Sequence, residues 1–428
     1  MTAERPLRIA VLSWSRRQVG GLETFVGTLI DELHSRGHEV AFWSELDVPA
    51  NRPRIQLPPG VASWSVDELG RERALAELRD WAPQVLSTHG IVDPSVEEAT
   101  LHIAPATFFA HAYTGTCISG AKSFSRPEPR PCDREFGWRC LAHYYPRRCG
   151  GLSPITMARE YGRQSRRLDL LRRYNQVFTY SRHMRDEYLR HGFTTDQLTV
   201  VELGVGSPEM LGLEARADGE DVDAPTRSAR GWEGEGPLRL LFMGRMDRLK
   251  GGRTLLDALP KLATPARPVR LVLAGDGPDR REWEHRARRL VARAPEEGGG
   301  KIEVVFEGWV NGARRAELLN DSDLLMIPSL WPEPFGLVGR EAGLCGIPSI
   351  AFAVGGIPDW LVDDANGCLA PGDPPSVDGL VAATNRAVRD GATYRRLSRG
   401  AARYARALNG RHGLGVVVAE LEKLARGA

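Results

Sequence analysis

Two glutamates, Glu333 and Glu341, flank a Phe-Gly turn in the segment PSLWPEPFGLVGREAGLCGIP (328–348). The apolar run just before them, DLLMIPS (323–329), predicts a buried strand, and the residues after the turn predict a helix. The free N–H groups at a helix start bind phosphate. A carboxylate beside a phosphate repels it, so the two glutamates suit hydrogen bonds from hydroxyl groups instead. The order of these residues fits a ligand with sugar hydroxyls and phosphates, and two exposed acids at a helix start fit the segment equally well.

Two cations stand in a second turn of the same kind. The segment GRMDRLKGG places Arg245 and Lys250 directly after the apolar run LRLLFMGRM (238–246). A departing diphosphate gains negative charge, and fixed cations stabilise that charge. Because no Asp-x-Asp motif accompanies them, we expect catalysis to require no metal cofactor. Exposed loop residues without a function are the alternative, since Arg and Lys are mostly surface residues.

A glycine pair marks the corresponding turn near the amino terminus. In SRRQVGGLE, Gly20 and Gly21 separate a predicted strand from a predicted helix (22–37). Glycine lets the backbone approach a phosphate closely, and the helix start that follows favours the charge. The dinucleotide pattern Gly-x-Gly-x-x-Gly is absent here, and a plain Gly-Gly turn is the alternative.

The elements that must position these residues alternate regularly between short apolar runs and amphipathic segments. Buried strands separated by helices indicate parallel, doubly wound sheets, in which ligands bind at the carboxyl ends of the strands. Predicted strands lie at 7–13, 38–44, 84–90, 105–112, 176–181 and 198–205, and then at 238–246, 269–277, 302–310, 323–329 and 348–354. Between the two series, residues 206–237 are acidic, rich in glycine and without apolar period, so they predict a linker or an insertion.

Composition limits the class of protein. A chain of 428 residues is too long for one ordinary core, so two domains are expected. The net charge of +2 gives no support for nucleic-acid binding. No apolar run approaches the roughly 20 residues of a membrane span, and the amino terminus has no signal-peptide core, so we expect a cytoplasmic protein.

Glu333 and Glu341, with seven residues between them, resemble the Glu-x7-Glu signature of the retaining GT-B glycosyltransferases of family 4, also called glycosyl transferases group 1. Further segments resemble motifs of that family in the same order along the chain. They are VGGLETFVGTLIDELHSRGHEV, FMGRMDRLKGGRTLLDAL, LVLAGDGPDRREWE, FEGWV and VGGIPDWLVDDANGCLAPGDP. The resemblance implies an α/β protein of the GT-B fold, with two Rossmann-like domains that face each other across an interdomain cleft.

The resemblance also implies that the two domains bind different substrates. Residues 1–205 would bind the acceptor, and residues 238–400 would bind the nucleotide sugar. Residues 401–428 would form a carboxy-terminal helix that packs back toward the first domain.

The roles of single residues follow from the same resemblance. The catalytic group would be Glu333, Arg245, Lys250 and His111, with Arg245 and Lys250 on the donor's diphosphate and Glu333 on sugar hydroxyls. The donor-binding group would be Gly20, Gly21, Trp309, Val310, Phe335, Gly336, Leu337 and Glu341, with Glu341 on the ribose. A lone histidine is more often structural, but in the family a histidine at the strand end of His111 faces the transferred sugar.

The expected reaction is transfer of a sugar from a nucleotide-diphosphate donor, UDP-sugar favoured and GDP-sugar as the other choice, to a glycan, lipid-linked or natural-product hydroxyl. Retention would arise by front-face substitution, in which the leaving phosphate oxygen takes the acceptor's proton. The alternatives are a sugar-nucleotide epimerase of the same fold and a catalytically silent partner subunit that binds the nucleotide sugar. We expect no nucleic-acid partner.

Two segments of the first domain depart from this pattern. A Pro- and Arg-rich loop (113–155) contains four cysteines, Cys117, Cys132, Cys140 and Cys149. Structural zinc, free thiols and disulfides all stay open for them, because four thiols can bind zinc but no Cys-x-x-Cys pair is present. The segment REYGRQSRRLDLLRRY (159–174) carries six arginines. It suits either contact with anionic lipid at the inner membrane face or, as we favour, a solvated helix face with paired charges.

Overall fold

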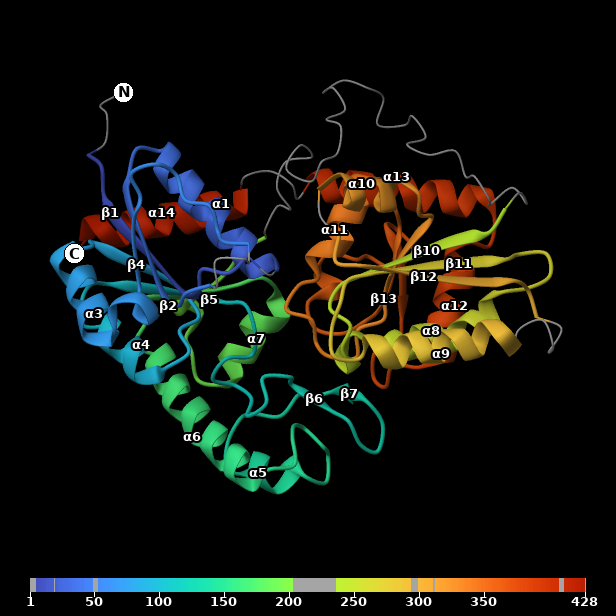
Figure 1. Cartoon of the computed structure of the whole chain (residues 1–428), viewed down its shortest axis with the longest axis horizontal. Helices are drawn as coiled ribbons and strands as arrows, with labels where there is room; N and C mark the ends of the chain where they lie inside the picture. Colours follow the sequence, from blue (N-terminus) through green and yellow to red (C-terminus); the bar gives the residue numbers. More distant parts are fainter. Residues whose placement is uncertain are drawn as a thin grey trace.

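The computed structural model describes residues 5–18, 20–48, 53–202, 236–293, 299–310, 312–407 and 412–427. These residues form two α/β domains that lie side by side, each built on a parallel sheet (Figure 1). The strands are short apolar runs that are buried on both faces, because helices cover both sides of each sheet. The prediction of two Rossmann-like domains is confirmed.

The first sheet has seven strands in the order β3-β2-β1-β4-β5-β8-β9. All of its pairs are parallel. The strands are β1 (Arg8–Ser15), β2 (Glu39–Leu46), β3 (Ala62–Ser65), β4 (Val85–His89), β5 (Ala106–Ala110), β8 (Gln176–Thr179) and β9 (Leu198–Val200). The helices are α1 (Gly21–Ser35), α2 (Val66–Leu69), α3 (Arg71–Asp80), α4 (Pro94–Thr100), α6 (Pro154–Leu171) and α7 (Arg182–Arg190), with a 3₁₀ turn at Thr195–Gln197.

The second sheet has six parallel strands in the order β12-β11-β10-β13-β14-β15. They are β10 (Leu238–Met243), β11 (Val269–Ala274), β12 (Ile302–Gly308), β13 (Leu324–Ile327), β14 (Ser349–Phe352) and β15 (Gly367–Ala370). Its helices are α8 (Gly252–Leu262), α9 (Arg280–Arg293), α10 (Gly312–Asn320), α11 (Leu337–Leu344), α12 (Val377–Ala387) and α13 (Gly391–Ala407). Short 3₁₀ turns lie at Arg248–Lys250 and Ile357–Asp359.

The last helix, α14 (His412–Gly427), leaves the second domain and lies against β1 and β4 of the first (Figure 1). Its buried side chains Val417, Val418 and Leu421 join the core cluster that includes Ile9 and Val11. Glu422 lies 3.0 Å from Nε2 of His38. The preceding helix α13 runs across residue 400, so the second domain extends beyond the limit we expected from the resemblance.

Two strands of the large parallel sheets, β3 and β15, were not predicted from the sequence. Both are four residues long and lie at sheet edges, and neither ASWS nor GCLA forms an apolar run of the length used for the other strands. The expected linker (206–237) lies almost entirely outside the described residues, of which only 236 and 237 belong to it.

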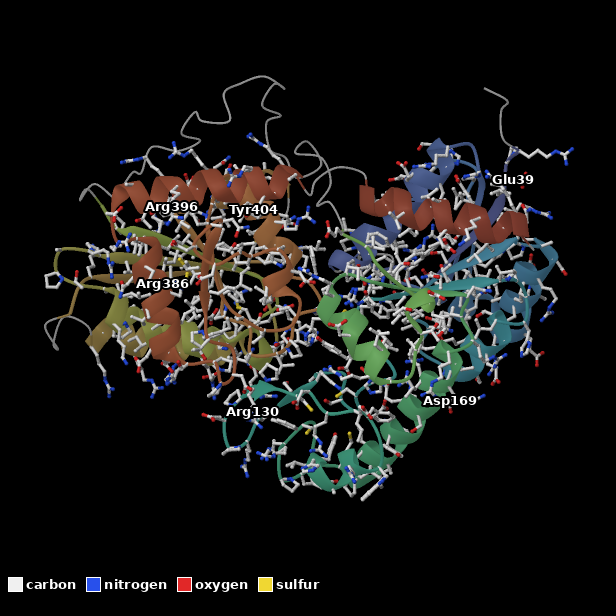
Figure 2. The ribbon with its side chains drawn as sticks, turned by 180° about the vertical axis from the view of Figure 1, so that it is seen from behind. Glu39, Arg130, Asp169, Arg386, Arg396 and Tyr404 are labelled. Carbon is white, nitrogen blue, oxygen red and sulfur yellow. The ribbon has the colours of Figure 1, made fainter. Side chains whose placement is uncertain are left out.

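The cysteine-containing loop folds into a small module, which lies below the two domains in the view of Figure 1. It contains a two-stranded antiparallel sheet, β6 (Ser123–Phe124) and β7 (Arg130–Pro131), and the short helix α5 (Arg139–Tyr144). Figure 2 shows Arg130 on this module and Asp169 on the outer helix α6. The module is fixed to the first domain by a buried ion pair between Lys122 and Glu187 of α7.

Candidate active site

Lys250 and Glu333 form the centre of the candidate site. Lys250 ends the 3₁₀ turn after β10, and Glu333 lies in the loop after β13, the neighbouring strand. Their side chains meet because the carboxyl ends of adjacent parallel strands share one edge of the sheet. Lys250 Nζ donates to Glu333 Oε1 at 2.6 Å, and Ser329 Oγ donates to the same oxygen at 2.5 Å. A cation and a buried carboxylate are thus held in contact at this edge of the sheet.

The backbone around Lys250 is held by one glycine. Gly251 has a φ of +70°, and a Cβ at this position would lie 1.7 Å from the carbonyl oxygen of Pro328. The turn that carries Lys250 therefore packs directly on the strand end that leads to Glu333. The lysine ammonium also lies over the ring of Trp331, 5.5 Å from its centroid.

The helix predicted after the Phe-Gly turn is α11, and it begins at Leu337 with Gly336 as its N-cap. Gly336 has a φ of +95°, a left-handed conformation that favours glycine. Glu341 lies on this helix, where it is buried and forms an ion pair with Arg315 of α10. Because Arg315 is bound to the carboxylate that we expect to hold the ribose, a ligand there must share or displace it.

The glycine pair of the first domain faces this helix start. Gly20 is the N-cap of α1, and its N–H donates to Glu23 Oε2 at 2.8 Å. A Cβ on Gly21 would lie 3.2 Å from the Leu337 side chain, so the two expected phosphate-binding turns approach each other across the domain boundary. Phe335 is buried between them, and its ring centroid lies 6.3 Å from that of Tyr180 in the first domain.

Three of the expected residues lie further out. Arg245 has a side chain that is 69% exposed, and its Nε lies 3.3 Å from Asp247 Oδ2. No ion pair within the described ranges joins it to Glu333, so the structure does not bring it into the contact of Lys250 with Glu333. Trp309 follows β12 and is 63% exposed, whereas Val310 packs partly buried against the core.

His111 follows β5 and lines a cavity of about 190 Å³ in the first domain. The apolar part of the lining includes Trp14, Leu22, Ile91 and Phe108. The guanidinium of Arg163 lies at its edge and donates to the carbonyl oxygen of Val92. The cavity adjoins the loop between β13 and α11 (328–336), which we call the donor loop because the resemblance assigns donor contacts to it. Tyr113, two residues beyond His111, donates from its hydroxyl to the carbonyl oxygen of Pro332 in this loop at 2.7 Å.

His111 does not stand alone at the base of this cavity. His89 Nδ1 lies 3.0 Å from His111 Nε2, and the Tyr180 hydroxyl lies 2.5 Å from His111 Nδ1. Burial lowers the pKa of His89 to about 3. Burial, and then the neighbouring His89, lower the pKa of His111 well below its ordinary value. Both imidazoles are therefore neutral at physiological pH.

No disulfide joins the four cysteines of the module in the described residues. Burial, with smaller contributions from the neighbouring thiols, raises the pKa of Cys132 to about 11 and that of Cys149 to about 12. Among the described residues, no three His, Cys, Asp or Glu side chains are grouped so that they could hold a metal ion. Structural zinc stays a prediction, which the metal content of the purified protein tests.

The arginine-rich segment 159–174 falls mainly on α6, and most of its charge is used inside the domain. Arg166 and Arg173 both pair with Glu98 of α4, and Arg167 pairs with the buried Glu97. Both of these glutamates lie on the neighbouring helix α4. One turn along the segment itself, Arg163 pairs with Glu160 and Arg172 with Asp169, which agrees with the paired, solvated helix face that we favoured.

Several residues of the site carried no sequence signal. His89, Tyr180, Glu23 and Arg315 become visible only when the strands and helices that bear them are brought together. A possible clue was the polar triplet Ser-Thr-His at the end of an otherwise apolar run (84–90), since polar residues at strand ends gather at one edge.

The family model described as Glycosyltransferase Family 4 matches residues 19–206, and that described as Glycosyl transferases group 1 matches residues 237–390. A D-inositol 3-phosphate glycosyltransferase from Xylanimonas cellulosilytica is 27% identical over 362 residues, which cover 83% of this chain and 81% of that protein. A glycogen synthase from Mycobacterium tuberculosis is 25% identical over 432 residues, 92% of this chain and 89% of that one.

Among solved structures, Alr3699/HepE from Anabaena, in complex with UDP, is similar with a TM-score of 0.63. The sequence identity is 18%, and the match covers 97% of this chain and 99% of that chain. An identity of 18% supports a shared fold and nothing finer. The two chains share that fold over nearly their whole length.

Proposed function

Because this chain belongs to glycosyltransferase family 4 and has the GT-B fold, we propose that it moves a sugar from a nucleotide-diphosphate donor to an acceptor hydroxyl with retention of configuration. The observation that carries the proposal is the meeting of Lys250, Glu333 and the start of α11 at one sheet edge, opposite Gly21 of the first domain. A UDP-sugar is the favoured donor, and the UDP complex of the Anabaena protein supports this choice.

In the proposed reaction, Lys250 and Arg245 bind the donor's diphosphate and stabilise the charge that grows on it as the glycosidic bond breaks. Lys250 must then exchange part of its contact with Glu333 for a phosphate oxygen. Glu333 accepts hydrogen bonds already, from Lys250 and Ser329, and this setting suits a carboxylate that binds sugar hydroxyls. The acceptor's proton passes to the leaving phosphate oxygen on the same face of the sugar, so no protein nucleophile and no metal is required.

We place the acceptor in the cavity lined by His111. The lining includes Leu22, which follows the Gly20–Gly21 turn, and the cavity's apolar walls with a polar base suit a molecule whose hydroxyl lies near His111. The acceptor, whether a glycan, a lipid-linked molecule or a small molecule, must present a hydroxyl on a part small enough to enter this cavity.

A thermal-shift panel of UDP-, GDP-, ADP- and dTDP-sugars tests the donor proposal. We expect one nucleotide class to raise the melting temperature, because a ligand that binds only the folded state stabilises it. The shift should disappear in Glu341→Ala and persist in Glu317→Ala, a matched change of a carboxylate that pairs with Arg314 on α10. If no nucleotide sugar shifts the wild-type protein, the silent partner subunit becomes the better proposal.

We also propose that the protein works in the cytoplasm, at the membrane's inner face, and that it contacts the membrane through the module and the first turn of α6 rather than through the arginine-rich part of α6. The module's cysteines form no disulfide in the described residues, which suits a reducing compartment. None of the helices in the described part of the chain has the length and apolar character needed to cross a membrane.

The module's tip carries exposed apolar side chains. Trp138 and Tyr145 stand seven residues apart at the two ends of α5, both with helical backbone angles, so they share one side of the helix. Leu152 and Ile155, at the start of α6, are 63% and 79% exposed. Between residues 136 and 159 the sequence has four arginines and no acidic residue, which suits an anionic surface.

Co-sedimentation with vesicles tests the membrane proposal. The protein should bind phosphatidylcholine vesicles that contain phosphatidylglycerol and be released at about 0.5 M salt, where charge attraction is screened. Leu152→Ser with Ile155→Ser should abolish binding, whereas Val291→Ser with Val362→Ser, which also changes exposed apolar residues, should not. Equal binding by the two double variants would contradict the proposal.

A further inference from the structure

Three buried polar side chains, Ser87, His89 and Tyr180, and the partly buried His111 form a continuous hydrogen-bonded chain at the base of the acceptor cavity. Ser87 Oγ lies 3.0 Å from His89 Nε2, which extends the contacts of His89 with His111 and of His111 with Tyr180. The members come from β4 and from the residues that follow β5 and β8, three neighbouring strands of the sheet. The contact between His111 and Tyr180 is the shortest of the three, at 2.5 Å.

The chain leaves His111 no free ring nitrogen. A neutral imidazole has one N–H and one acceptor nitrogen, so each histidine must donate to one neighbour and accept from the other. If Tyr180 donates to His111, then His111 donates to His89 and His89 donates to Ser87. If Ser87 donates to His89, every bond reverses. In both arrangements the two His111 nitrogens are occupied, and its tautomer is set by its neighbours.

Tyr180 also connects this chain to the donor side. Its hydroxyl binds His111, while its ring packs near the ring of Phe335 in the loop between Glu333 and α11. The Tyr180 ring further contacts Phe109 and Phe25, whose rings lie 4.6 and 6.4 Å away. The ring position is therefore fixed on both sides, and the hydroxyl is fixed with it.

We propose that Tyr180 and His89 are positioning residues, which hold His111 as a neutral ring in one orientation between the acceptor cavity and the donor loop. On this basis His111 acts on the sugar and acceptor through a fixed ring face and edge, and it does not serve as a titrating base. The proposal rests on the proposed glycosyl transfer for its kinetic test, but its spectroscopic test is independent of that function.

The central variant is Tyr180→Phe, which keeps the ring and removes the hydroxyl. We expect kcat to fall by about tenfold or more, because a ring that is no longer fixed misplaces the reacting groups, while KM for the donor stays nearly constant. The matched control is Tyr394→Phe, which removes a buried hydroxyl that donates to a backbone carbonyl in the second domain. A merely structural role would make the two variants alike.

The activity readout is release of nucleoside diphosphate from the nucleotide sugar that stabilises the wild-type protein. His89→Gln should lower kcat in the same way as Tyr180→Phe. A kcat for Tyr180→Phe equal to that of Tyr394→Phe would overturn the proposal.

The second readout needs no ligand. In ¹⁵N spectra of the full chain labelled at histidine, His89 and His111 should each show one neutral tautomer that does not titrate between about pH 5 and pH 8. The charged groups nearest the chain are Glu23, beside Tyr180, and Arg163 and Arg167 at the cavity. In Tyr180→Phe the His111 signals should shift to another tautomer or a mixture. Unchanged His111 signals would overturn the proposal even if no nucleotide sugar is ever a substrate, and so separate its failure from that of the proposed function.

Discussion

Lys250→Ala should lower sugar transfer by at least about 100-fold, because it removes a fixed cation that stabilises the departing diphosphate. The structure makes this lysine the best placed cation of the site, since its ammonium already lies 2.6 Å from Glu333 at the carboxyl edge of the second sheet. The expected loss is in kcat, measured as nucleoside diphosphate released. Lys261→Ala is the matched control, because Lys261 forms an exposed ion pair with Asp378 in the same domain.

Stability separates the chemical effect from a folding defect. Lys250→Ala leaves the buried Glu333 carboxylate without its cation, and we expect a loss of about 1–3 kcal/mol in the free energy of unfolding. Adding Glu333→Gln removes the buried charge and should restore most of that stability but none of the activity. A Lys250→Ala protein that keeps more than about a tenth of the wild-type kcat would contradict the assigned role.

Gly251→Ala should be the most destabilising small substitution near the site. Its Cβ would meet the Pro328 carbonyl oxygen at 1.7 Å, so backbone must move, and the left-handed φ of +70° adds strain. We expect a loss of about 3–5 kcal/mol, in the range of severe core changes. Because Lys250 precedes this glycine, transfer should fall as well.

Gly37→Ala separates strain from collision. Gly37 has a similar φ of +83°, but a Cβ there would meet nothing within 4 Å. Its expected loss is therefore the conformational part alone, about 1–2 kcal/mol. Urea unfolding of both variants measures the difference, and equal midpoints would show that the contact with Pro328 relaxes freely.

The fold could be predicted from the sequence because its strands are buried on both faces and therefore appear as uninterrupted apolar runs. Strands β1 and β13 are examples, whereas the edge strand β3 reads ASWS and is only partly buried, so it left no such run. The other missed strand, β15, is mostly buried, but its sequence GCLA is too short to stand out as an apolar run.

The donor side of the site was more readable than the acceptor side. Glu333, Lys250 and Gly336 lie in short turns whose sequence and order resemble a known family, and the structure brings Glu333 and Lys250 into contact. The partners of His111 could not be predicted in this way. Tyr180 follows His111 by 69 positions in the chain, and only the pairing of β5 with β8 brings the two together.

The path of the last helix limits how the domains can move. The chain crosses between them twice, once between Glu202 and Gly236 and once between Ala407 and His412, before α14 packs on the first sheet. Because α14 belongs to the core of the first domain, the second domain is joined to the first at both of its ends and cannot move away without α14 leaving that core. The same path matters when domains are exchanged between relatives. A first domain taken from a relative would keep its core covered only if that relative's last helix were taken with it.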